Sequence, residues 1–227
     1  MSDATRIFPL GDSALTVEFG NEISVELNER AIALSEYLES HPFTGFIETV
    51  PAYASTTVFY DLVEVRAAHP FRETAFDAVR QIVEEAFSDI NVGRSADPQT
   101  IEIPVHVDAD SALDLHLVAE SAGLTPDEVI DIFLARTYRV FMLGFLPGFT
   151  YMAEVDERIA MPRKDAPRTA VPKGSVGIAG KQTGIYSLGS PGGWQIVGRT
   201  DVAMFTPDAD RPTLLQPGDR VQFIPAK

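Results

Sequence analysis

The segment from Gly144 to Thr200 constrains the fold of this chain more than any other part of the sequence. Glycine and proline recur throughout it, so its backbone must be built from turns and short strands with pre-set dihedral angles. Strands at this density, with a turn roughly every 8 to 12 residues, are typical of all-β architectures. The segment therefore predicts a closed β-barrel rather than a parallel sheet.

Basic and amide side chains lie between these turns, and rigid loops that present such groups commonly bind an anionic or amide-bearing ligand. Arginine forks hold carboxylates or phosphates bidentately, and side-chain amides and hydroxyls can read an amide or ureido group. The candidate substrate-binding residues are Arg163, Arg168, Lys173, Gln182, Thr183, Tyr186, Gln195 and Arg199.

Aromatic side chains of the same segment are the candidate walls of such a site, namely Phe145, Phe149, Tyr151 and Trp194. Two interpretations stay open. The segment is either a binding site or a turn-rich barrel whose polar residues face water, and Trp194 is either a ligand contact or a core residue. Gly192 and Gly193, just before Trp194, have no side chains, so either a ligand or another part of the chain could come close to the backbone there.

Composition excludes several classes of function. The 227 residues carry a formal net charge of -15, so DNA, RNA and anionic membranes are unfavourable partners, although a small anionic ligand fits the local basic cluster. There is no cysteine, which removes disulfides and thiolate chemistry. The four histidines show no metal-pair spacing, so we expect no metal site.

The sequence contains no phosphate-loop motif, no signal peptide and no candidate membrane span. The glycine-rich run Gly189–Gly193 is followed by no Gly-Lys-Ser/Thr ending, so we expect this chain to bind no cofactor and not to contact ATP. The N-terminus lacks a basic region followed by an apolar run, and no apolar stretch approaches the length of a membrane span. We therefore expect a cytoplasmic protein.

Hydrophobic periodicity predicts an α+β domain over residues 1–90, a linker over 91–99 and the barrel domain over 100–227. The first domain is expected to run ββαββα. Its predicted elements are strands 7–10 and 14–19, a helix over 24–38, strands 45–50 and 55–60, and a helix over 71–87. In the second domain we expect strands at 101–107, 139–145, 212–215 and 220–224, and a helix over 113–122 that Gly123 ends. A second helix runs to about Arg136; Thr125 is its N-cap, Pro126 its first residue, and Glu128 closes a capping box.

Four stretches of this sequence carry a family resemblance: GFLPGFTYM, PRKDAPRTAVPKGSVGIAGKQTGIY, SPGGWQIVGRT and LLQPGDRVQF. They are similar to the family formed by the B subunits of 5-oxoprolinases, also called allophanate hydrolase subunit 1. This family also includes an inhibitor of a sporulation histidine kinase and part of the carboxyltransferase domain of urea carboxylase.

The resemblance implies an α+β domain joined to a cyclophilin-like barrel, working in a heteromer with a second barrel-bearing subunit (the C subunit of 5-oxoprolinases, or allophanate hydrolase subunit 2). It also implies a site shared between the two subunits. The implied reaction is ATP-dependent hydrolysis of an amide beside a carboxylate, either in 5-oxoproline or in a urea-derived compound such as allophanate. The complex uses ATP, and this chain is not expected to be active alone.

This sequence departs from the family pattern in one region. After the strand at Ile103-Pro-Val105 the family usually has a tyrosine, a glycine pair and a Gly-Pro before an Asp-Leu pair. This chain has Val107, Asp108-Ala109 and Ala112-Leu113 there, and keeps only the Asp-Leu pair, as Asp114-Leu115. The family usually also has a histidine at the position of Phe133, and phenylalanine cannot transfer a proton. Either the chain is a paralogue with an altered substrate or lost catalysis, or the missing residues were structural and the barrel site still works. His106, one position before Val107, is a candidate to replace part of the function of the missing imidazole.

Three hypotheses follow for the function. The first is a subunit of an ATP-dependent amide or ureide hydrolase. The second is a regulatory protein that binds a proline-bearing segment of a histidine kinase in the barrel groove. The third is a ligand-binding domain without catalysis.

Overall fold

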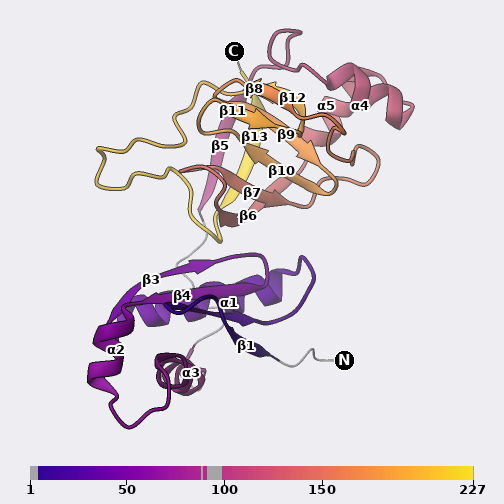
Figure 1. Ribbon diagram of the computed structural model, residues 1–227. Coiled ribbons are helices and arrows are strands. Elements are labelled where there is room, and N and C mark those ends of the chain that lie inside the picture. Colours follow the sequence, from indigo (N-terminus) through magenta and orange to yellow (C-terminus); the bar gives the residue numbers. More distant parts are fainter. Residues whose placement is uncertain (1–4, 88, 91–98, 227) are drawn as a thin grey trace. The chain divides into compact units, whose positions relative to one another are not determined.

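The computed structural model describes residues 5–87, 89–90 and 99–226 (Figure 1). The chain divides into two compact units, residues 1–97 and 98–227, and each is described by itself. Of the predicted linker 91–99, only Gln99 is among the described residues.

The first unit is a four-stranded antiparallel sheet with helices packed on one face. Its elements are β1 (Arg6–Pro9), β2 (Ala14–Glu18), α1 (Val25–Ser40), β3 (Phe46–Pro51), β4 (Ser55–Tyr60), α2 (Leu62–Ala68) and α3 (Ala75–Ala86). The strand order is β1-β2-β4-β3. The two strands of each predicted ββ pair are therefore antiparallel neighbours, and the second strands of the two pairs lie side by side.

The structure differs from the predicted helix over residues 71–87. That helix begins only at Ala75, behind the N-cap Thr74, and Phe71 is fully exposed. An additional short helix, α2, precedes it, because the Asp61 carboxylate accepts hydrogen bonds from the backbone N–H groups of Val63 and Glu64, both at 2.8 Å. A helix of seven residues is too short to show a clear 3.6-residue period, so only the cap marks it in the sequence.

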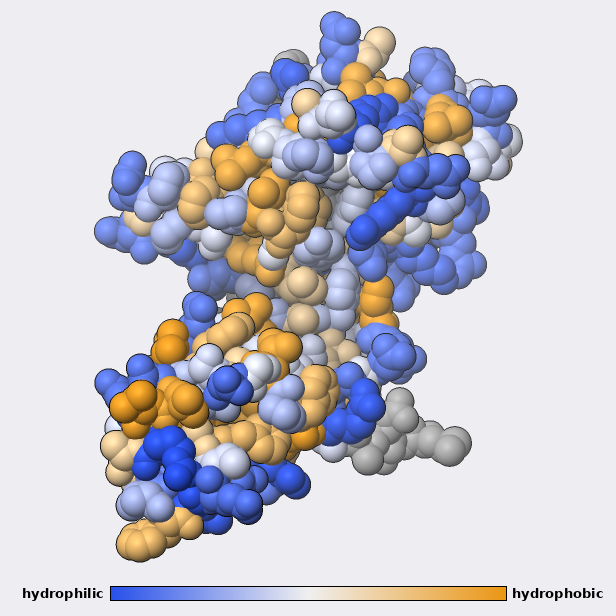
Figure 2. Space-filling model, in the orientation of Figure 1, coloured by the Kyte–Doolittle hydropathy of each residue, from blue (hydrophilic) through white to orange (hydrophobic). Residues whose placement is uncertain are grey.

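Alternation along the strands of the first unit separates a buried face from an open one. Leu15, Val17 and Val58 are fully buried against the helices. The opposite face carries a cross-strand row of Phe8, Thr16, Thr57 and Val50. Hydrophobic side chains gather on the surface of this unit in Figure 2. Its exposed large apolar residues are Phe8, Leu10, Val25, Ile47, Val50, Leu62, Val63 and Phe71.

The second unit is dominated by a seven-stranded mixed sheet. Its elements are β5 (Thr100–Val105), α4 (Leu115–Ala122), α5 (Pro126–Leu134), β6 (Thr137–Leu143), β7 (Thr150–Ala153), β8 (Arg168–Val171), β9 (Ser175–Ala179), β10 (Gln182–Ile185), β11 (Ser190–Gly192), β12 (Gln195–Arg199) and β13 (Arg220–Pro225). The strand order is β12-β9-β10-β7-β6-β13-β5, while β8 and β11 form a separate ribbon. The β13–β5 pair is parallel, so the sheet combines both pairing types. The predicted strand at 212–215 is reduced to one bridge between Phe205 and Thr213.

This sheet is a nearly closed barrel, and its two outermost strands meet at a seam. His106, just beyond β5, donates its backbone N–H to the Arg199 carbonyl at 2.8 Å, and its carbonyl accepts from the Arg199 N–H at 2.9 Å. A Cβ on Gly198 would lie 2.4 Å from Val105 Cγ1 and 3.0 Å from the His106 carbonyl oxygen. The seam therefore requires glycine at position 198.

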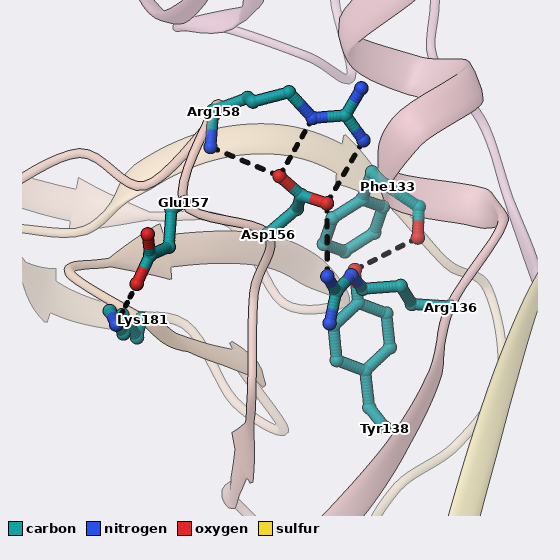
Figure 3. Close-up of polar contacts among 7 residues, drawn as sticks. All are labelled: Phe133, Arg136, Tyr138, Asp156, Glu157, Arg158 and Lys181. Carbon is teal, nitrogen blue, oxygen red and sulfur yellow. Dashed lines mark hydrogen bonds and ion pairs between the residues drawn. The ribbon is translucent and has the colours of Figure 1, made fainter.

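Helices α4 and α5 pack against each other beside the barrel, α4 against β12 and α5 against β13 (Figure 1). The predicted capping box of α5 is confirmed, since Thr125 and Glu128 satisfy each other's backbone N–H groups. Phe133 is only 1% exposed, and its ring stacks on that of Phe223. Figure 3 shows Phe133 beside Tyr138, whose ring centroid is 5.1 Å away. The position where the family usually has histidine therefore belongs to the hydrophobic core here.

None of the helices in the described ranges is long and apolar enough to cross a membrane.

Candidate functional site

A cluster of aromatic rings lies on the opposite face of the barrel wall from the main core. Ile185 of β10 packs into that main core, so Tyr186, the next residue, points to the other side. The ring of Phe149 is central, with centroids 4.8 Å from Tyr151, 5.1 Å from Tyr186 and 5.5 Å from Trp194. The structure therefore brings together the predicted wall residues, which with Tyr186 form what we call the aromatic cluster: Phe145, Phe149, Tyr151, Tyr186 and Trp194.

A glycine in β10 makes room for these rings. A Cβ on Gly184 would lie 3.0 Å from Phe149 Cζ and 3.1 Å from Trp194 Cζ3, and only 2.5 Å from the Thr150 carbonyl oxygen. Any larger residue at this position would push the rings away from the sheet. The glycine content of the segment thus serves packing of the cluster as well as turns.

Phe145 forms the exposed edge of the aromatic cluster. Its φ angle is 68°, which is unusual for a residue other than glycine, and Leu146 N–H donates to the Gly144 carbonyl at 2.8 Å around it. The side chain is 60% exposed, and its ring lies 5.5 Å from that of Phe149. A strained backbone therefore holds an aromatic ring in water at the border of the cluster, which is typical of binding sites.

A buried carboxylate lies next to the aromatic cluster. Asp114, directly before α4, is 4% exposed and receives two hydrogen bonds from the Arg168 guanidinium, both at 2.7 Å. Lys164 Nζ donates at 2.9 Å, and the backbone N–H of Ile196 at 2.7 Å. Burial raises the pKa of Asp114, but these donors outweigh it and bring the pKa below its ordinary value. We call this arrangement the Asp114 clamp.

The Asp114 clamp ties the loop over residues 162–168 to the start of β12. Two further contacts support it: Lys164 N–H donates to the Gly193 carbonyl at 2.7 Å, and Gln195 Nε2 donates to the Pro162 carbonyl at 2.9 Å. The loop thereby places the guanidinium carbon of Arg163 5.8 Å from the centroid of the Trp194 ring. Arg163 is exposed and forms no ion pair with any carboxylate in the described ranges.

The charge of Arg163 affects the pKa values of the two tyrosines of the cluster, Tyr151 and Tyr186. Burial raises the pKa of Tyr151, and the charge of Arg163 partly opposes that effect. Burial likewise raises the pKa of Tyr186, and this effect is opposed by a hydrogen bond from the backbone N–H of Trp194 and by the charges of Arg163 and Arg168. The positive charge of Arg163 therefore favours the ionised form of both phenols, although burial dominates and keeps both pKa values raised.

The remaining predicted site residues take several different positions in the second unit. Thr183 is fully buried and donates to the Gly177 carbonyl at 2.9 Å, on the core side of β10. Arg199 is at the far end of β12 from Gln195, at the barrel seam. Lys173 is exposed in the turn between β8 and β9, and Gln182 is half-buried at the start of β10. The structure thus gathers Arg163, Arg168, Tyr186 and Gln195, whereas Thr183 faces the main core and Arg199 lies at the seam.

Two residues of the site, Asp114 and Lys164, are missing from the sequence-based candidates. Asp114 is the aspartate of the Asp-Leu pair in which this chain keeps the family pattern, and that agreement was the available signal. No local pattern links it to Arg168, 54 positions further on. His106, the suggested substitute for the missing imidazole, lies at the seam with its Nε2 3.0 Å from Asp201 Oδ2.

Comparison with known proteins shows the class of protein that this fold and site define. Residues 5–215 match the carboxyltransferase domain, subdomain C and D, and the chain belongs to this family.

Among individual relatives, the chain is 45% identical over 220 residues to the 5-oxoprolinase B subunit of Bacillus subtilis (strain 168), covering 96% of this chain and 92% of that protein. It is 34% identical over 222 residues to the 5-oxoprolinase B subunit of Escherichia coli O157:H7, covering 98% and 96%. The crystal structure of TTHA0988 has a TM-score of 0.81 and 37% identity over 94% of this chain. This chain spans only 40% of the TTHA0988 chain.

Proposed function

We propose that this chain is the B subunit of an ATP-dependent 5-oxoprolinase, in which it binds the cyclic amide substrate. The observation that carries the proposal is near full-length similarity to two proteins that are named as the B subunit of 5-oxoprolinase, at 45% and 34% identity. The reaction is hydrolysis of the ring C–N bond of 5-oxoproline: water adds to the carbonyl carbon, and the nitrogen leaves as the amine of glutamate. ATP hydrolysis drives this step.

The chemistry of the candidate site suits such a substrate. 5-Oxoproline is a small, nearly planar ring that carries one carboxylate beside its amide. The exposed Phe145 and the half-buried Tyr151 of the aromatic cluster offer apolar contacts for the ring, and the exposed guanidinium of Arg163 offers paired donors for the carboxylate. Rigid aromatic walls with a few fixed polar groups are the usual composition of small-molecule sites.

The proposal assigns ATP to another subunit and the catalytic site to a complex. The glycine-rich run Gly189–Gly193 lacks the lysine and hydroxyl residue of a phosphate loop. The relative TTHA0988 has more than twice the length of this chain, so the homologous segment there is joined to further sequence. A second barrel-bearing subunit that completes the site is consistent with both observations.

The experiment is an ATP hydrolysis and ring-opening assay with 5-oxoproline. This chain is tested alone, then mixed with its candidate partner subunits, and the partners are tested without it as the control. We expect glutamate formation coupled to ATP hydrolysis only in the complete mixture. The proposal is wrong if a stable complex forms but releases no glutamate, and turnover of allophanate instead would reassign the substrate to a ureide.

A further inference from the structure

The contacts of the Asp114 clamp divide the cationic side chains of the site into two roles. Both terminal nitrogens of Arg168 are bound to Asp114, and Lys164 shares the same carboxylate. Arg163 has no such partner in the described part of the chain. We propose that Arg163 is the specificity-determining residue that binds the substrate carboxylate, and that Asp114 is a positioning residue that holds Arg163 over Trp194. The proposal rests on the proposed function for the identity of the ligand.

The charge balance of the site supports a ligand with one carboxylate. The loop and the clamp bring three cations, Arg163, Lys164 and Arg168, together with two carboxylates, Asp114 and the exposed Asp165. One positive charge is left over in a chain whose formal net charge is -15. A surplus cation held beside apolar rings attracts a small monoanion more strongly than the acidic surface repels it, because that repulsion is screened over about 8 Å at physiological salt.

Contact with Trp194 prepares Arg163 for this role. A guanidinium that lies over an indole ring keeps its N–H donors in its own plane, where a carboxylate can take two of them. The ring also restricts a side chain that would otherwise lose much rotamer entropy on binding. Trp194 is itself 4% exposed, so it supports Arg163 and does not occupy the binding surface.

Asp114 acts through the loop and not on the ligand. Its carboxylate is enclosed by four donors, so no face of it is available to a substrate. Replacing it by asparagine keeps an acceptor for the Ile196 N–H but removes the charge that holds Lys164 and Arg168. The backbone contact from Lys164 to Gly193 and the Gln195 contact to Pro162 remain. The loop is then loosened and Arg163 is displaced without loss of the barrel.

The test compares two ligands that differ only in the carboxylate: 5-oxoproline and 2-pyrrolidinone. Trp194 is the single tryptophan of the full chain, so its fluorescence reports on this site. We expect wild-type protein to bind 5-oxoproline about 10- to 100-fold more tightly than 2-pyrrolidinone, the range for a hydrogen-bonded charge pair. Arg163→Ala is expected to abolish this ratio, and Asp114→Asn to reduce it. General loss of structure would weaken both ligands alike and leave the ratio unchanged.

The matched control is Arg158→Ala, another exposed arginine of the same unit. Arg158 pairs with Asp156, which also holds Arg136 at 2.9 Å, so the carboxylate keeps a partner when Arg158 is removed (Figure 3). This variant is expected to keep the full ratio between the two ligands. The inference is overturned if wild-type protein shows no response to 5-oxoproline, responds equally to both ligands, or keeps its preference in Arg163→Ala.

These outcomes are separable from the test of the proposed function. Ring opening by the complex, together with an unchanged preference in Arg163→Ala, would keep the function and reject the role of Arg163. A carboxylate preference that depends on Arg163, with no turnover in any complex, would keep the binding role and reject the function.

Discussion

At the scale of single residues, Asp114 joins three parts of the second unit that are distant in sequence. Its backbone N–H donates to the Ile196 carbonyl at 2.8 Å while its side chain accepts from the Ile196 N–H, so α4 begins fixed to β12. Arg168 opens β8 and Lys164 lies in the loop before it. Breaking a buried charge pair by removing one partner costs about 3 kcal/mol or more.

We predict that Asp114→Asn lowers the free energy of unfolding at pH 7 by about 3 kcal/mol, because Lys164 and Arg168 lose their charged partner. The pKa of Asp114 is below its ordinary value in the folded protein. Its stabilising contribution is therefore complete above the unfolded pKa of about 3.9 and is lost as the pH falls through the folded pKa. Urea unfolding followed by Trp194 fluorescence measures both effects. A difference between wild type and variant that stays constant down to strongly acidic pH would contradict this account.

Phe133 illustrates what a single residue can and cannot reveal from sequence. The family resemblance marks this position because histidine is usual there. In the structure its side chain stacks on Phe223 with centroids 5.1 Å apart, and its carbonyl accepts a hydrogen bond from Tyr138 Oη at 2.8 Å. Phenylalanine at this position packs against Tyr138 and Phe223. The sequence does not show this packing, because Phe223 is 90 positions away along the chain.

At the scale of elements, the ends of α4 and α5 that face each other follow local chemistry and could be predicted from the sequence, whereas the start of α3 could not. Thr125, Pro126 and Glu128 form the expected cap of α5, and Gly123 ends α4 with a φ of 67°. The short helix α2 was missed because its signal is one capping aspartate and not a periodic pattern. Strand ends were shifted by a few residues, as in β6, which spans Thr137–Leu143 and not 139–145.

We predict that Thr125→Ala destabilises the second unit by about 1 kcal/mol, because the N–H of Glu128 loses its side-chain acceptor and the capping box is broken. Glu128→Gln is the control, since glutamine can still accept from the Thr125 N–H. Thermal unfolding followed by Trp194 fluorescence compares the two variants. Equal losses in both would show that the charge of Glu128, and not the cap, stabilises the helix.

At the scale of the whole molecule, two compact units with separate hydrophobic cores make up the chain. In the second unit, closure depends on strands far apart in sequence: β5 pairs with β13 on one side and meets β12 at the seam on the other. Gly198 allows the seam to form, because any side chain there would overlap Val105.

We predict that Gly198→Ala destabilises the second unit by about 1 to 3 kcal/mol, the usual cost of overpacking. Gly189→Ala is the matched control: its Cβ would meet only the Val171 carbonyl oxygen at an ordinary 3.8 Å, so a change within about 0.5 kcal/mol is expected. Urea unfolding measures both variants. A Gly198→Ala protein as stable as the control would mean that the seam can widen without cost.

The sequence alone determined the turn-rich character of the second unit, the capping box of α5 and the residue types of the site, because these depend on neighbours along the chain. Only the tertiary structure decided which arginine is bound internally and which faces outward. Arg163 and Arg168 are five positions apart and look equivalent in sequence, and what separates them is the carboxylate of Asp114, brought to Arg168 by the packing of α4 on β12. Long-range contacts of this kind leave no local pattern, because burial and pairing are set by residues far away in the chain.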